Sequence, residues 1–334
     1  MSLPIIKYCP GTLKAGFDSY SPAALRNVFN GKKVSHILPY SAPKRDEDTN
    51  ELFLENRKRI SISGVQEKLS LILDKNKLRL TEAGEQGTHL LKPIPTDLKK
   101  VDQVPANEHL TMQIASQVYG IHTAANALIF FQDGEPAYIT KRFDVKEDGS
   151  KWGKEDFAAL AGRTSENAGT NFKYTYDYTR LGLLIQRLIP AWRVEIEKYY
   201  AQVVFNYLFS NGDAHLKNFA VHETANHDHI LSPSYDLIDT RIHVDDTNFA
   251  LNGGLMNEGI RSIAYKKTGT PTYRDFITFG KAIGISDKRI EKILSVFCER
   301  QEMVETLIQH SYLSDSTKRT YLRHYNTRRN QLGK

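Results

Sequence analysis

Apolar residues follow two different spacings along the chain. Up to about residue 145 they lie in short runs, many of them alternating with polar residues, which is typical of β-strands. These runs predict strands at residues 69–74, 77–81, 88–92, 127–131 and 137–143. Residues 107–119 have helical spacing instead, with Leu110, Ile114 and Val118 on one face and Gly120 to end the helix. The first part is therefore expected to be a sheet with one main helix.

After residue 155 the apolar residues recur every three or four positions. This pattern predicts helices at residues 178–188, 194–209 and 287–310, with a hairpin at residues 219–222 and 229–231. A sheet-rich part followed by a helix-rich part indicates an α+β fold with two lobes. We expect residues 1–145 to form the N-terminal lobe and residues 146–334 the helical C-terminal lobe.

The composition indicates a water-soluble globular protein, since 40% of the 334 residues are apolar and 25% are charged. No run of about 18 apolar residues is present to span a membrane, and the first residues lack the pattern of a secretion signal. Cys9 and Cys298 lie too far apart to suggest a disulfide framework or a metal site. We therefore expect a cytoplasmic protein with no membrane contact.

Positive charge is concentrated at the C-terminus. The net charge is +6, and the basic tail contains Lys318, Arg319, Arg323, Arg328, Arg329 and Lys334, interleaved with Tyr321 and Tyr325. A solvated helix face is the favoured interpretation of this tail. Contact with nucleic acid or with an acidic partner is the alternative.

The most informative motif is residues 211–218, NGDAHLKN, followed by residues 234–237, SYDL. It places Asp213 just after a predicted helix, Asn218 five residues later, and Asp236 after the predicted hairpin. Protein kinases use an Asp, an Asn five positions on and a later Asp as base and metal ligands. Ordinary turn chemistry also explains Asn-Gly-Asp and remains the alternative.

Under the kinase interpretation each polar residue of this motif has a role. Asp213 would orient and deprotonate a substrate hydroxyl, and Asn218 and Asp236 would hold Mg²⁺. Lys217 would lie near the γ-phosphate of ATP, and His215 would support the loop.

Three histidines in the predicted hairpin also suggest a zinc site, namely His222, His227 and His229. Neither a cysteine nor a second carboxylate cluster completes the ligand set. The turn of the hairpin explains these residues better.

The first part contains candidates for nucleotide binding. Residues 61–68, SISGVQEK, precede a predicted strand, and a loop with Gly64 and Val65 would let backbone N–H groups approach phosphates. Lys92 ends an apolar strand and so needs an anion or water. Glu108, near the start of the main helix, could pair with Lys92 or only stabilise the helix N-terminus. A plain turn and a strand-end lysine are the alternatives.

Residues 140–144, TKRFD, leave the last predicted strand where the composition changes. A hinge between lobes would contact adenine there through backbone groups. Lys141 and Phe143 are therefore candidate ATP-binding residues.

In this order, the motifs resemble the HipA family of bacterial serine/threonine kinase toxins. The matching segments are SISGVQEK (61–68), THLLK (88–92), NEH (107–109), KRFD (141–144), EDF (155–157), NGDAHLKNF (211–219) and LSPSYD (231–236). The resemblance implies a cytoplasmic Mg-ATP-dependent toxin of a toxin–antitoxin system that phosphorylates an aminoacyl-tRNA synthetase, tryptophanyl or glutamyl. It also implies autophosphorylation at Ser61 and Ser63.

The Ser-Ile-Ser pair is similar to the short HipT branch of the family. Long HipA proteins carry a further subdomain before this loop, whereas this chain has 60 residues before Ser61. In HipT systems a separate small protein, HipS, replaces that subdomain. The resemblance thus implies a HipS-like antitoxin and a HipB-like helix-turn-helix partner, with DNA contacted only through the complex.

Two other function classes remain. One is a kinase-like but inactive binding module in a DNA-bound repressor complex, which would need neither Asp213 nor Asp236. The other is a metal phosphohydrolase that would use Asp213, His215 and Asp236 and would turn over without ATP.

Overall fold

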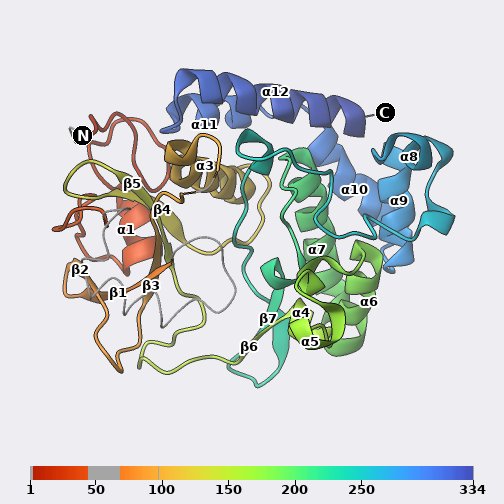
Figure 1. The fold of residues 1–334 in the computed structure, drawn as a ribbon, viewed down its shortest axis with the longest axis horizontal. Coiled ribbons are helices and arrows are strands. Elements are labelled where there is room, and N and C mark those ends of the chain that lie inside the picture. Colours follow the sequence, from red (N-terminus) through yellow and green to blue (C-terminus); the bar gives the residue numbers. More distant parts are fainter. Residues whose placement is uncertain (1–2, 44–67, 97, 334) are drawn as a thin grey trace. The chain divides into compact units, whose positions relative to one another are not determined.

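The computed structural model describes residues 3–43, 68–96 and 98–333. The chain forms two compact units (Figure 1). The first comprises residues 1–113, 124–151 and 303–318, and the second comprises residues 114–123, 152–302 and 319–334. The expected boundary between lobes at residue 145 stays a prediction.

In the described part of the first unit, five antiparallel strands form a sheet in the order β2-β1-β3-β5-β4. The strands are β1 (Leu69–Asp74), β2 (Lys77–Leu80), β3 (His89–Lys92), β4 (Asn126–Phe130) and β5 (Pro136–Lys141). All five predicted strands are present, with bounds that differ by at most two residues.

One face of this sheet packs on helix α1 (Pro22–Phe29), whose N-terminus is capped by the Ser21 hydroxyl (Figure 1). Alternate strand residues form the core with this helix, namely Leu69, Leu71, Leu78, Leu91, Ala127, Ile129, Ala137 and Ile139. Because successive side chains point to opposite faces, Lys92 and Tyr138 lie on the other face of the sheet.

Helix α3 (Val104–Gln117) approaches that other face, where the Gln113 side chain donates to Asn126 Oδ1 of β4 at 3.0 Å. The helix begins three residues before the predicted start, since Pro105 is acceptable in a first turn. Gly120 follows with φ +62°, a conformation that glycine adopts readily, which agrees with the predicted end.

The second unit is mostly helical, and α7 (Trp192–Leu208) is buried along most of its length. The other helices of this unit are α4 (Phe157–Leu160), α5 (Ser165–Ala168), α6 (Tyr178–Leu188), α8 (Ile263–Thr268), α9 (Tyr273–Ala282), α10 (Asp287–Cys298) and most of α12 (Asp315–Leu332). Three short strands form a small antiparallel sheet, namely β6 (Lys154–Asp156), β7 (Ala220–Glu223) and β8 (His229–Leu231). The predicted hairpin is thus present as β7 and β8.

The prediction of one helix over residues 287–310 is wrong. Two helices occupy this segment, α10 and α11 (Glu302–His310), and the chain is extended at Glu299 with ψ 148°. The apolar stripe of α10 is buried in the second unit, whereas that of α11 belongs to the first. Periodicity alone missed the break because each helix carries its own apolar stripe.

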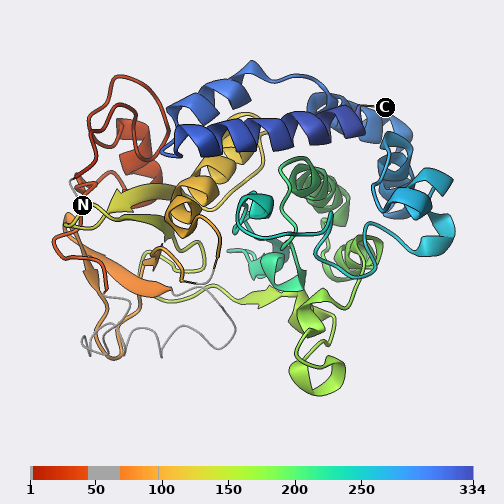
Figure 2. The same cartoon turned by 45° about the horizontal axis from the view of Figure 1, so that its top comes forward.

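The end of α11 lies beside the N-terminal segment of the first unit (Figure 2). His310 stacks on Tyr8 with ring centroids 4.0 Å apart, and its Nδ1 lies 2.9 Å from the Leu13 carbonyl oxygen. These contacts join the two ends of the unit's sequence. Among the described residues, no helix has both the length and the apolar character needed to cross a bilayer.

Two buried histidines make the first unit sensitive to acid. Burial lowers the pKa of His89 to about 4 although its Nε2 contacts the Val28 carbonyl at 2.8 Å. Burial likewise lowers the pKa of His109 to about 4. Both imidazoles are therefore neutral in the folded protein at pH 7.

We expect the free energy of unfolding to fall as the pH drops from 6.5 towards 4. Unfolding lets each histidine take up a proton that the folded state resists, so each contributes about 3 kcal/mol of destabilisation by pH 4. Urea unfolding at pH 7 and pH 4.5 measures the effect, and His89→Gln should reduce it. The exposed His229→Gln should leave it unchanged, and equal pH dependence in both variants would contradict the assignment.

Candidate active site

In the first unit the structure brings together the lysine and the glutamate expected to pair. Lys92 Nζ at the end of β3 lies 2.6 Å from Glu108 Oε1 on α3, and both side chains are almost fully buried. The ammonium also lies 5.3 Å from the centre of the Tyr138 ring. Because an isolated buried charge is costly, the close contact of the two opposite charges offsets the cost of burying each of them. A part for the pair in nucleotide binding stays a prediction.

The other nucleotide-binding candidates of this unit are less informative. Lys141 ends β5, and its exposed Nζ donates to Asn30 Oδ1 at 2.5 Å. Phe143 follows the strand and is half-buried. The remaining candidates, Ser61, Ser63, Gly64 and Val65, lie outside the described residues.

In the second unit the loop that carries Asp213 is tied to the segment that carries Asp236. After α7 ends, Ser210 turns the chain with φ +53°. The Asn211 amide then donates to Asn206 Oδ1 at 3.0 Å and to the Asp236 carbonyl oxygen at 3.2 Å. An amide has two N–H groups, so both bonds form at once. The last turn of α7 therefore anchors both segments.

The predicted metal ligands have a donor set that suits Mg²⁺. Asn218 Nδ2 donates to the Asp213 carbonyl oxygen at 3.2 Å, which leaves the amide oxygen as the atom to meet a cation. Asp236 has φ +56°, and the neighbouring Tyr235 hydroxyl donates to the Lys217 carbonyl oxygen at 2.8 Å. An amide oxygen and a carboxylate are the ligands that hard cations prefer.

The Asp213 carboxylate is half-exposed, with 51% of its side chain accessible. Desolvation raises its pKa above the usual value, and the nearby carboxylates of Asp246 and Asp236 act in the same direction. Lys173 and the Tyr174 hydroxyl lower the pKa in opposition. The Asp213 carboxylate is thus accessible to solvent and has both acidic and basic groups nearby. A general base must be accessible to the proton that it accepts.

His215 is a buried neutral imidazole at the base of this loop. Burial lowers its pKa to about 3, so its Nε2, 3.9 Å from Asp213 Oδ1, forms no ion pair at pH 7. Within the described part of the chain its Nδ1 has no hydrogen-bond partner. The edge of its ring packs on Tyr174, with centroids 5.3 Å apart. The loop-supporting role expected for His215 stays a prediction.

Sequence reasoning missed two residues that lie against this loop. The Tyr174 hydroxyl donates to Asp213 Oδ1 at 2.9 Å from a short 3₁₀ segment, Phe172–Tyr174. Asp246 lies close enough to raise the pKa of Asp213. Neither belongs to a motif with a fixed spacing, so the sequence alone gives no signal for either residue.

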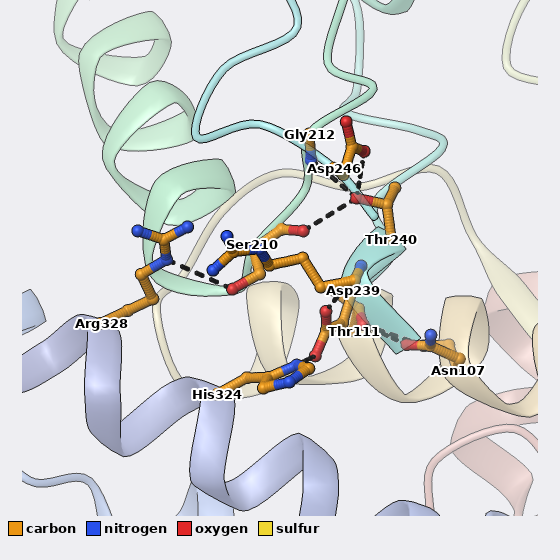
Figure 3. A network of polar contacts seen from close by, with 10 residues as sticks. Asn107, Thr111, Ser210, Gly212, Asp239, Thr240, Asp246, His324 and Arg328 are labelled. Carbon is orange, nitrogen blue, oxygen red and sulfur yellow. Dashed lines mark hydrogen bonds and ion pairs between the residues drawn. The ribbon is translucent and has the colours of Figure 1, made fainter. Parts of the chain in front are cut away.

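Thr240 joins the loop to Asp246 (Figure 3). The Gly212 N–H donates to Thr240 Oγ1 at 2.9 Å, and this hydroxyl lies 2.7 Å from Asp246 Oδ2. A Cβ atom on Gly212 would lie 2.4 Å from the Asp246 carboxyl carbon. Glycine is therefore required before Asp213 because the Asp246 carboxylate occupies the place of a side chain.

Helix α12 supports the same loop from its C-terminal half (Figure 3). Arg328 Nη2 donates to Asn248 Oδ1 at 2.6 Å, and its Nε lies 3.4 Å from Ser210 Oγ. His324 Nδ1 lies 2.8 Å from Oδ2 of Asp239, and Asp239 follows Asp236 by three residues in the chain.

The interpretation of the basic tail as a solvated helix face is therefore wrong for part of it. Arg328, Tyr321 and Tyr325 are buried, with the Tyr325 ring stacked on Phe209 at 5.3 Å. They face the interior of the unit because they recur at helical spacing on one side of α12. Arg323 lies on the exposed side.

Two of the three histidines of the hairpin have local partners. His222 Nδ1 lies 2.9 Å from the Glu223 carbonyl oxygen, and His227 Nδ1 lies 2.7 Å from Glu223 Oε1. His229 is exposed. In residues 3–43, 68–96 and 98–333, no three His, Cys, Asp or Glu side chains are grouped as metal ligands.

We expect Arg328→Met to lower the free energy of unfolding by about 1–3 kcal/mol, because it leaves the buried Ser210 hydroxyl and the half-buried Asn248 amide oxygen without their donor. Urea unfolding of the full chain measures the change. Arg323→Met, on the exposed side of the same helix, should stay within about 0.5 kcal/mol of the wild type. Equal effects of the two substitutions would contradict a bracing role for Arg328.

Comparison with known proteins agrees with this architecture. A family model described as HipA-like C-terminal domain matches residues 60–305. A protein of Haemophilus influenzae named "Putative kinase" is 24% identical over 310 residues, which cover 89% of this chain and 87% of that protein.

Two solved structures have a similar fold. One belongs to the Shewanella oneidensis toxin–antitoxin complex of HipA, HipB and operator DNA, with TM-score 0.59, 19% identity and coverage of 81% of this chain. The chain spans 63% of that protein, less than two thirds. The other is the Helicobacter pylori proinflammatory kinase CtkA, with TM-score 0.50, 15% identity and coverage of 76% of this chain and 90% of CtkA. The predicted α+β fold of the two-lobed kinase type is confirmed.

Proposed function

The chain belongs to the HipA-like C-terminal domain family, and we propose that it is an ATP-dependent protein kinase that phosphorylates serine or threonine. The loop of Asp213 carries this proposal. Its carboxylate is half-exposed, the Asn211 amide ties the loop to the Asp236 segment, and the Asn218 side chain is hydrogen-bonded to the Asp213 carbonyl oxygen. In this arrangement Asp213 would be the base, and Asn218 and Asp236 would provide the two oxygen ligands.

In the proposed reaction the substrate hydroxyl oxygen attacks the γ-phosphorus of ATP, and the hydroxyl proton passes to the Asp213 carboxylate. The bond between the γ-phosphorus and the bridging oxygen breaks, and its electrons leave with ADP. Asn218 and Asp236 would hold Mg²⁺, which neutralises charge on the phosphates when it is bound. Lys92, kept in place by Glu108, would contact the phosphates, with Lys217 near the γ-phosphate.

The remaining site residues belong to the same proposal. Gly64 and Val65 would approach the phosphates, Lys141 and Phe143 would contact the adenine, and His215 would support the loop. Autophosphorylation at Ser61 and Ser63 would add negative charge beside the nucleotide phosphates and so weaken ATP binding.

We extend the proposal to a cytoplasmic toxin of the HipT type. Its substrate would be an aminoacyl-tRNA synthetase, tryptophanyl or glutamyl, and its partners a HipS-like antitoxin and a HipB-like DNA-binding protein. The HipA and HipB complex with operator DNA from Shewanella oneidensis supports the second partner and DNA contact through a complex.

We expect Asp213→Asn to reduce phosphoryl transfer by about 10²- to 10⁴-fold, because the amide cannot accept the proton, while folding is retained. Transfer from ATP labelled in its γ-phosphate, to the chain itself and to lysate proteins, measures the loss. Asp287→Asn, on the surface of α10, is the matched control and should retain activity. Phosphoproteomics with wild type and Asp213→Asn in parallel then identifies the substrate.

Three results would contradict the kinase proposal. Equal labelling by wild type and Asp213→Asn would remove Asp213 as the base. If the wild type binds ATP without transfer and binds promoter DNA in a salt-dependent manner that Asp213→Asn leaves unchanged, the inactive binding module would be favoured. Turnover in the absence of ATP would favour the phosphohydrolase.

A further inference from the structure

We propose that Tyr174 is a positioning residue for phosphoryl transfer, whose hydroxyl fixes the orientation of the Asp213 carboxylate. This inference rests on the proposed function. The hydroxyl donates to Asp213 Oδ1 at 2.9 Å, and half of the Asp213 side chain is exposed. With Oδ1 engaged by the phenol, Oδ2 is the oxygen left to receive the proton of a substrate hydroxyl.

The segment of Tyr174 is held firmly enough for this role. The Asn252 N–H donates to the Tyr174 carbonyl oxygen at 2.9 Å, and the Gly253 N–H donates to the Tyr176 carbonyl oxygen at 2.8 Å. Immediately after this segment, the Asp177 carboxylate caps α6 by accepting from the Arg180 N–H at 2.8 Å. The backbone at Tyr174 and just after it is therefore bound to structure that does not include the Asp213 loop.

The ring of Tyr174 is also restrained. Its face lies 4.9 Å from Lys173 Nζ, and it meets the His215 ring edge-on at an interplanar angle of 72°. Burial raises the pKa of the Tyr174 hydroxyl, and the Asp213 charge raises it further, so the phenol stays protonated and acts as the donor.

Orientation matters because the terminal torsion of an aspartate is broad. A half-exposed carboxylate would rotate among several orientations, and few of them would place an oxygen for proton transfer. One charge-assisted hydrogen bond from a fixed donor selects among these orientations before a substrate arrives. The contribution should appear in the chemical step and not in nucleotide binding.

A different role for the same contact is also testable. A hydroxyl bonded to the general base occupies the place of a substrate hydroxyl, so Tyr174 would be a phosphoacceptor if it were itself modified. Its Oη would then attack the γ-phosphorus, its proton would pass to Asp213, and ADP would leave. Phosphate on Tyr174 after incubation with ATP, detected by mass spectrometry, would overturn the positioning role.

Tyr174→Phe in the full chain is the main test, because it removes the hydroxyl and keeps the ring on His215. We expect kcat to fall about 10- to 100-fold, the value of a hydrogen bond to a charged group. KM for ATP should change less than about twofold, since a positioning residue acts in the transition state. Single-turnover transfer from labelled ATP gives the rate of the chemical step.

Tyr176→Phe is the matched control on the same segment, since the Tyr176 ring packs on Arg180 at 4.4 Å. It should transfer phosphate at the wild-type rate. The double variant Tyr174→Phe/Asp213→Asn should be no slower than Asp213→Asn alone, because the hydroxyl acts only through the carboxylate.

The outcomes separate the two proposals. A Tyr174→Phe protein with wild-type kcat, or one whose loss adds fully to that of Asp213→Asn, would overturn the inference while the kinase proposal stands. If Tyr174→Phe lowers thermal stability as well as kcat, and Tyr176→Phe lowers both in the same way, the role of Tyr174 is structural and the inference is overturned too. If the wild type and Tyr176→Phe transfer no phosphate, the proposed function fails and the inference fails with it.

Discussion

The hydroxyl of Thr240 is the contact on which the geometry of the second unit's site depends. It accepts from the Gly212 N–H at 2.9 Å and lies 2.7 Å from Asp246 and 3.0 Å from the Ser210 carbonyl oxygen. A hydroxyl has a single proton to donate. The Asp246 carboxylate is the nearer and the stronger acceptor, so Thr240 donates to it. The Thr240 hydroxyl thus bridges the Asp246 carboxylate and the Gly212 N–H, which belongs to the backbone just before Asp213.

This contact imposes a steric condition as well as an electrostatic one. The Asp246 carboxylate fills the space beside Gly212 in which a Cβ would lie 2.4 Å from its carboxyl carbon. Ser210 has φ +53°, and this turn brings Gly212 beside Asp246. Arg328 of α12 contacts the Ser210 hydroxyl. A loop of irregular backbone is therefore held by side chains from segments far apart in the sequence, which explains how it keeps one conformation without regular hydrogen bonding.

Sequence reasoning was most successful where one local pattern decides the structure. Alternation located the five strands, and helical spacing located α6 and α7. It failed where two equally periodic helices adjoin, because nothing in the stripes of α10 and α11 records that they belong to different units. The short loops around Asp213 could be recognised by spacing because their residues lie close together in the chain.

Tyr174, Asp246 and Arg328 could not be found in that way. They lie 39 residues before, 33 after and 115 after Asp213, and each reaches the loop through tertiary structure. A tyrosine, an aspartate and an arginine at such distances carry no signal in a single sequence, since each residue type is equally ordinary on a surface.

These distant residues explain why a loop rich in carboxylates is stable as it stands. Asp236 and Asp246 both disfavour the ionised form of Asp213, and desolvation adds to their effect. Lys173 and the Tyr174 hydroxyl favour the ionised form, while burial keeps His215 neutral and so prevents a competing ion pair. The donors that hold Asp213 ionised come from the Tyr174 segment and not from its own loop. The Asp213 carboxylate therefore meets a donor fixed by another segment of the chain, and the proposed phosphoryl transfer would require electrostatic preorganisation of this kind.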